Sequence, residues 1–328
     1  MGELVLQLPV LERLRRRDPG ARVDVLGSTP SIQLLQGSRL IDGLYDLRAW
    51  GMRNRDDVMP GPTRRKLGKW VKARQYDAVL NVAQAPAAVR QLLVERFEDR
   101  CVHEVARPRV LEAPRLDLPQ DVTQQAGHTL GALVGQGPGA LVGLCAGAAA
   151  TLRSWPLAKL ARLADLLTPR VECQFLVFGP RQHEVADWLR QHVRRPERIH
   201  SSETGHLQMT AGLLSRCRVA VCDDPEWTHL AAALGVPTVA IFGPTYPGLQ
   251  LPSHPWVMAV GGRSMDRVEA EDVMGAMMEL LGSTSPQEPG GRSLHSAGQP
   301  PPQGPPPYRR SAGPGDAARS GAKSMKQV

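Results

Sequence analysis

The sequence is poor in aromatic residues and cysteines, and it has no long apolar run. Aromatic side chains make up 4% of its 328 residues. None of the five cysteines forms a Cys-x-x-Cys pair, and three lie in apolar runs typical of strands, which favours small buried thiols in a reducing compartment. No stretch approaches the roughly 20 apolar residues of a transmembrane helix, and no secretory signal is visible. We therefore expect a soluble, cytoplasmic protein.

Metal and nucleic-acid sites also lack support. No group of His, Cys and Asp has the spacing of metal ligands, and the doublet Asp223-Asp224 does not match the Asp-x-Asp motif of metal-dependent transferases. The basic clusters near the N-terminus contain only two aromatic residues, Trp70 and Tyr76, whereas nucleic-acid grooves usually interleave both kinds. We expect no metal, no cofactor and no nucleic-acid partner.

The charge and the composition divide the chain into three parts. The whole protein is formally +8, with about +5 over residues 1–135 and −1 over residues 136–282. Residues 283–328 are half Pro, Gly or Ser, which is typical of a disordered basic tail. The positive first part favours an anionic partner, although solvated helix faces explain the same charge.

Short apolar strands alternate with amphipathic helices, most clearly after residue 139. This alternation predicts an α/β fold of parallel sheets covered on both faces. We expect two Rossmann-like, doubly wound domains that face a cleft, over residues 1–137 and 138–282. Such a domain normally begins with a strand, but this chain begins with a helix, so we expect that the first strand is missing. The predicted strands are 23–26, 78–82, 140–145, 173–178, 219–222, 238–242 and 256–260.

One segment of the second domain has the chemistry of an anion site. Asp224 follows a predicted strand and Pro225 opens a helix, a pattern typical of an N-cap with proline in the first turn. The backbone N–H groups at such a helix start bind phosphates. His229 lies one turn further and Arg153 lies on the first loop, where its charge would stabilise a leaving diphosphate. The alternatives are a plain helix cap, a buried histidine and an arginine stacked on Trp155.

Three segments in this domain resemble the ADP-heptose:lipopolysaccharide heptosyltransferase family, glycosyltransferase family 9, which has the GT-B fold. The first is Val142–Ala149 with Arg153-Ser154-Trp155-Pro156, and the second is Phe175–Pro180 with Glu184 beyond it. The third and most specific is Asp224 to His229, with the Ala-rich helix and Phe242-Gly243-Pro244-Thr245 that follow. Near the start, Gly2-Glu3 and Leu8-Pro9 are similar to the family's Gly-Asp and Leu-Pro.

The resemblance implies inverting, metal-independent transfer of a heptose-like sugar from an ADP-linked donor to a lipopolysaccharide core or another surface saccharide. A carboxylate deprotonates the acceptor hydroxyl in this chemistry, and the matching position is Glu3. The resemblance assigns donor contacts to Ala148, Ala149 and the neighbourhood of Gly205. The other candidate donor contacts are the residues of the predicted anion site, Arg153, Asp224, Pro225, Glu226 and His229, and also Glu184, whose carboxylate can accept hydrogen bonds from ribose hydroxyls.

Departures from the family pattern leave a second hypothesis open. Pro225-Glu226 stands where the family has Ser or Thr followed by Gly, which removes an N–H donor and adds a negative charge near the phosphates. Arg153 replaces a lysine, and Glu3 replaces an aspartate and also fits a simple first-turn helix acid. The alternative is a degenerate, non-catalytic relative that binds a ligand or a partner.

Two basic clusters lie in the first domain, at residues 13–17 and 64–74. They fit an anionic lipid-linked acceptor and peripheral contact with the inner face of the cytoplasmic membrane. Solvated helix faces remain the alternative.

Overall fold

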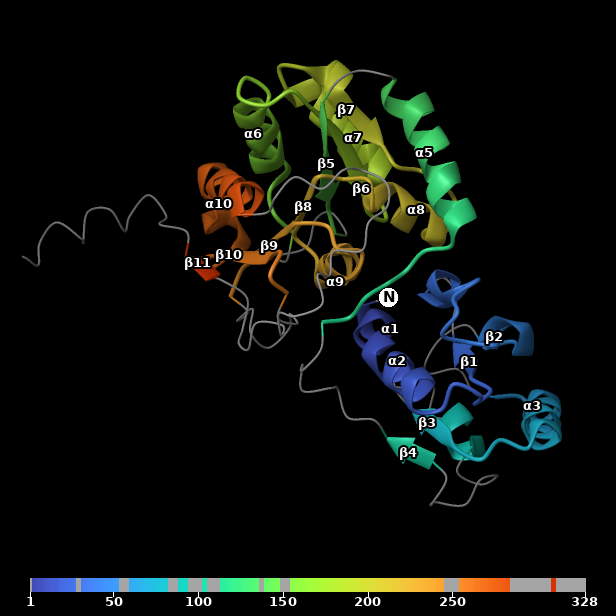
Figure 1. Ribbon diagram of the computed structural model, residues 1–328. Coiled ribbons are helices and arrows are strands. Elements are labelled where there is room, and N and C mark those ends of the chain that lie inside the picture. Colours follow the sequence, from blue (N-terminus) through green and yellow to red (C-terminus); the bar gives the residue numbers. More distant parts are fainter. Residues whose placement is uncertain are drawn as a thin grey trace, which may run out of the picture. The chain divides into compact units, whose positions relative to one another are not determined.

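The computed structural model forms two compact units of α/β structure (Figure 1). One contains Met1–Pro119 with His206–Gln208, and the other contains Gln120–Gly205 and Met209–Val328. The structure describes residues 2–27, 31–52, 59–81, 88–93, 102–104, 113–135, 139–147, 154–244, 254–283 and 308–310. No helix among these residues is both long and apolar enough to cross a bilayer.

The first unit has two small parallel sheets. Strand β1 (Asp24–Gly27) pairs with β2 (Gly43–Asp46), and β3 (Val79–Asn81) pairs with β4 (Val102–Glu104). Its helices are α1 (Gly2–Leu6), α2 (Leu8–Arg17) and α3 (Gly61–Arg74), and residues 88–93 are also helical. Leu67 and Val71 of α3 are buried in an apolar cluster with Leu47 and Leu92.

The second unit contains one seven-stranded parallel sheet with the order β11-β10-β9-β8-β5-β6-β7. Its strands are β5 (Ala140–Cys145), β6 (Cys173–Phe178), β7 (Ile199–Ser201), β8 (Val219–Cys222), β9 (Thr238–Phe242), β10 (Val257–Gly261) and β11 (Tyr308–Arg310). Its helices are α5 (Gln120–Val134), α6 (Leu157–Leu167), α7 (Gln182–His192), α8 (Leu207–Leu214), α9 (Pro225–Ala233) and α10 (Ala270–Ser283). The predicted α/β class with parallel sheets is therefore confirmed.

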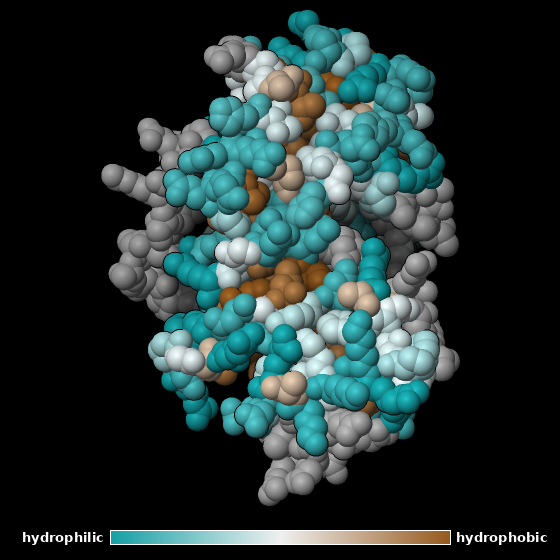
Figure 2. Space-filling model, turned by 90° about the vertical axis from the view of Figure 1, so that its right-hand side faces the viewer, coloured by the Kyte–Doolittle hydropathy of each residue, from teal (hydrophilic) through white to brown (hydrophobic). Residues whose placement is uncertain are grey.

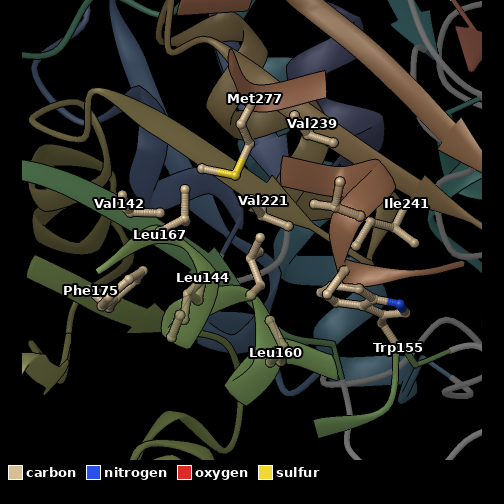
Figure 3. Packing of buried hydrophobic residues seen from close by; sticks show 14 of the residues in the cluster. Val142, Leu144, Trp155, Leu160, Leu167, Phe175, Val221, Val239, Ile241 and Met277 are labelled. Atoms are coloured by element: carbon tan, nitrogen blue, oxygen red, sulfur yellow. The ribbon is translucent and has the colours of Figure 1, made fainter. Parts of the chain in front are cut away.

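Helices cover both faces of this sheet because its strands are apolar on both sides. On one face, α6, α7 and α10 pack on strand residues such as Val142, Leu144 and Val221 (Figure 3). On the other face, Ala232 of α9 packs with Ala240 and Phe242 of β9. Burial of all of β8 and β9 explains their uninterrupted apolar sequences.

Two boundaries differ from the sequence prediction. Helix α5 belongs to the second unit, because Arg216 donates to the carbonyl oxygen of Thr123 at 2.7 Å and Gly212 packs closely on Ala126. The units therefore divide before α5, whereas the predicted boundary between residues 137 and 138 follows it. Within the predicted disordered tail, residues 308–310 form strand β11 beside β10, and the rest of the tail lies outside the described residues.

Most of the described residues on the face shown in Figure 2 are hydrophilic, and the hydrophobic ones form small groups among them. The buried apolar side chains of the described residues form clusters within each unit, such as those around Leu144 and Leu67. Only Leu80 and Met278 are large hydrophobic residues with high exposure in the described part of the chain.

Candidate functional site

The candidate site lies at the carboxyl ends of β5 and β8 in the second unit. These two strands are neighbours, with Cys145 opposite Cys222. Helix α6, which follows β5, covers one face of the sheet, and α9, which follows β8, covers the other. The chain therefore leaves neighbouring strands in opposite directions at this point, which is where open α/β sheets bind ligands.

Helix α9 begins with the predicted cap. Asp224 has extended backbone angles (φ −122°, ψ 131°), and its Oδ1 accepts hydrogen bonds from the backbone N–H of Glu226 at 2.8 Å and of Trp227 at 3.4 Å. Pro225 occupies the first turn, and Pro225 and Glu226 are exposed. The local sequence therefore specifies where this helix starts.

The same cap corrects one part of the sequence prediction. We expected free backbone N–H groups at this helix start, but Pro225 has none, and those of Glu226 and Trp227 already bond to Asp224. The next N–H, of Thr228, bonds to the carbonyl oxygen of Asp224 at 3.0 Å. The prediction of free amides is wrong because the cap residue occupies them, and a phosphate would have to displace its carboxylate.

Asp223 is the residue that the sequence reasoning missed. Its Oδ1 accepts the backbone N–H of Gly147 at 2.7 Å, and its Oδ2 accepts that of Trp155 at 2.9 Å. Burial raises the pKa of Asp223 to about 6; these two hydrogen bonds oppose that shift, and the charge of Asp224 adds to it. The acidic doublet at a strand end was the available signal, but it was considered only as a metal motif.

Ala148, Ala149 and Arg153 lie outside the described residues, which include Gly147 before them and Trp155 after them. A Cβ on Gly147 would lie 3.3 Å from Oδ1 of Asp223 and 3.3 Å from Cβ of Asp224. Trp155 is buried in the apolar cluster and donates its ring N–H to the carbonyl oxygen of Val268 at 2.9 Å (Figure 3). The structure thus brings both ends of this segment to the start of α9.

His229 lies in the second turn of α9 and is buried, with 5% of its surface exposed. A second buried histidine, His254, is near enough for the two to affect each other electrostatically. Burial lowers the pKa of His254 to about 3, with a smaller contribution from the charge of His229. This burial favours the buried-histidine alternative for His229 over direct contact with a ligand.

Glu184 and Gly205 follow the carboxyl ends of β6 and β7. Glu184 is exposed in the first turn of α7, where it forms an ion pair with Arg181. Gly205 is exposed in the turn before α8, with a φ of +64°. No hydrogen bond of the described residues joins either one to Asp223 or Asp224.

Glu3 lies in α1, in the other unit, and its side chain lies outside the described residues. In the parts of the chain that the structure describes, no cluster of His, Cys, Asp or Glu has the arrangement of a metal site.

Comparisons with known proteins agree with this fold. The sequence pattern of glycosyltransferase family 9 (heptosyltransferase) matches residues 83–277. Lipooligosaccharide heptosyltransferase 2 of Haemophilus influenzae is 26% identical over 190 residues, which cover 54% of this chain and 54% of that protein. The match thus spans about half the length of that relative.

Two solved structures share the fold. ADP-heptose lipopolysaccharide heptosyltransferase II of Escherichia coli matches with a TM-score of 0.67 and 20% identity, over 85% of this chain and 95% of that one. The glycosyltransferase family 9 protein of Veillonella parvula matches with a TM-score of 0.71 and 16% identity, over 86% and 94%. The chain belongs to glycosyltransferase family 9.

Proposed function

We propose that the chain transfers a heptose-like sugar from an ADP-linked donor to a lipopolysaccharide core or another surface saccharide. The donor class is supported by relatives of the same fold, which include an Escherichia coli heptosyltransferase, WaaC, solved with ADP. The proposal rests on the hydrogen bonds through which Asp223 joins the end of β5 and the start of α6 to the start of α9. These bonds lie where the neighbouring strands β5 and β8 lead to helices on opposite faces of the sheet.

The proposed reaction is an inverting displacement without a metal. A carboxylate, assigned to Glu3, removes the proton of an acceptor hydroxyl, whose oxygen bonds to the anomeric carbon while the bond to the diphosphate breaks. The departing diphosphate gains negative charge, which the Arg153 guanidinium would stabilise. Ala148, Ala149 and the start of α9 would contact the donor, and Glu184 and Gly205 are further candidates for its nucleoside part.

The anionic acceptor and the membrane contact are assigned to the first unit. Helix α3 carries six basic residues and no acidic one, and Arg65, Lys66, Lys69 and Lys72 are exposed. Such a helix suits phosphorylated saccharides or the anionic lipids of the inner membrane face.

Calorimetry with ADP tests the donor site. Arg153→Ala should weaken ADP binding by about tenfold or more, because a charged hydrogen bond to phosphate is lost. Glu226→Gly should strengthen it, because a carboxylate is removed from the start of α9. Arg162→Ala is the matched control, since this exposed arginine of α6 pairs with Glu271 at 2.9 Å. If neither the wild type nor Glu226→Gly binds ADP, the donor-site proposal is wrong.

A non-catalytic relative remains the second candidate, and the occupied amides of α9 favour it. Pro225 has no backbone N–H, and Asp224 accepts the N–H groups of Glu226 and Trp227. The helix start therefore has no free N–H in its first three residues for a diphosphate unless the cap rearranges. Asp224 and Glu226 add negative charge at the same place. Mass spectrometry of an acceptor incubated with ADP-heptose discriminates the two functions. ADP binding without sugar transfer supports the non-catalytic candidate, whereas transfer that Glu3→Gln abolishes supports the enzyme.

A further inference from the structure

Asp223 connects the end of β8 with the end of β5 and the start of α6, which lie far from it in the sequence. It follows β8 directly, and its two carboxylate oxygens each accept one backbone N–H, from Gly147 after β5 and from Trp155 before α6. These donors lie 76 and 68 residues earlier in the sequence. The Asp223 side chain thus holds both ends of the connection between β5 and α6. Asp223 stands directly before Asp224, the cap residue of α9.

The geometry requires a carboxylate and a glycine. An asparagine has a single acceptor oxygen and would point its amide N–H₂ at the other backbone N–H, so it can replace only one of the two bonds. A side chain at Gly147 would press on Asp223 and Asp224, because its Cβ would lie within 3.3 Å of both. Both features indicate that the contact depends on a carboxylate at residue 223 and on the absence of a side chain at residue 147.

We propose that Asp223 is a positioning residue, which holds the backbones of Gly147 and Trp155 against the start of α9 so that the adjoining residues can meet a nucleoside diphosphate. The inference rests on the proposed function for its ligand. Arg153, the cation assigned to the leaving diphosphate, stands two residues before Trp155 in the sequence. Asp223 itself acts through these amides and is not assigned a contact with the donor.

Amide hydrogen exchange tests the positioning role without any ligand. In full-length protein labelled with ¹⁵N at glycine and tryptophan, Asp223→Asn should accelerate exchange at Gly147 and Trp155 by about tenfold, because charge-assisted hydrogen bonds are lost. Gly143 in β5 and Trp188 in α7 carry the same labels and should stay within about twofold of the wild type, since local opening leaves the core intact. Equal acceleration at all four amides would mean a general loss of stability and would overturn the inference.

Asp165→Asn is the matched control. Asp165 also accepts a backbone N–H, from Arg194 at 2.8 Å, but it lies near the end of α6 rather than at the candidate site. If Asp223→Asn fails to fold, Gly147→Ala disturbs the same contact from the opposite side and should accelerate exchange at Trp155.

Calorimetry with ADP then tests whether the hydrogen bonds of Asp223 affect the affinity for the ligand. Asp223→Asn should weaken ADP binding by about tenfold, whereas Asp165→Asn should change it by less than about twofold. Unchanged ADP affinity in Asp223→Asn would overturn the inference even if exchange is accelerated. If the wild type binds no ADP while Gly147 and Trp155 show the local acceleration, the proposed function fails and the positioning of the two backbones by Asp223 stands.

Discussion

Gly179 shows how a single residue allows two strands to approach each other at their carboxyl ends, next to the candidate site. It follows β6 with a φ of +136°, a conformation that L side chains rarely adopt. A Cβ at this position would lie 2.1 Å from the carbonyl oxygen of Ala146, the residue that follows β5. The absence of a side chain therefore allows the ends of β5 and β6 to approach each other.

Gly179→Ala should lower the free energy of unfolding by about 3 kcal/mol or more, because backbone strain adds to a clash with backbone atoms. Gly131 is the matched control: it is exposed within α5, and a Cβ there would meet nothing within 4 Å. Gly131→Ala should be neutral or raise stability by up to about 1 kcal/mol. Urea unfolding of both variants measures the difference, and equal effects would contradict this account of Gly179.

At the scale of elements, helix α3 is held to the small β1–β2 sheet by a polar cluster around a buried carboxylate. The Asp24 side chain is 3% exposed, and it lies 3.6 Å from Arg74 of α3. The Arg74 guanidinium lies 4.2 Å from the ring centroid of Trp70 and donates to the hydroxyl of Tyr45 at 3.0 Å. Arg74 thus joins the end of α3 to both strands.

Arg74→Met keeps the apolar stem and removes the guanidinium, so it leaves Asp24 with one cation fewer. We expect a loss of about 2 kcal/mol in the stability of this unit, because a buried carboxylate loses a partner and a cation–π contact disappears. Arg65→Ala, an exposed change on the same helix, should stay within about 0.5 kcal/mol. Thermal unfolding followed by near-ultraviolet circular dichroism tests this, and equal shifts in the two variants would contradict the assigned role.

At the scale of the whole molecule, the second unit buries four free thiols, and this agrees with the expected small buried cysteines. They are Cys145, Cys173, Cys217 and Cys222, of which Cys145 and Cys222 face each other across β5 and β8. Burial raises the pKa of Cys173 to about 11 and that of Cys145 well above its usual value. A thiol reacts as the thiolate, so these groups should be inert while the unit is folded.

A Cys101→Ser variant leaves only these four thiols, and a disulfide reagent such as Ellman's should not label them in the native protein at neutral pH. All four should react once urea unfolds the second unit, with the same midpoint as the loss of helical signal. Rapid labelling of even one thiol in the native variant would show that this unit opens locally.

The sequence alone determined most of the strands of the second unit. Strands β5, β6, β8 and β9 have their predicted bounds, because continuous apolar runs are local signals. It missed β2, β4, β7 and β11, which have three or four residues each, but it placed the cap of α9 at Asp224 and the helix start at Pro225, as the structure does.

Only the tertiary structure decided the strand order, the boundary before α5 and the occupation of the α9 amides by Asp224. It also decided that Asp223 meets Gly147 and Trp155 and that His229 is buried. The physical reason is that these features depend on hydrogen bonds and packing between residues far apart in the chain, whereas local patterns report only which face of an element is apolar.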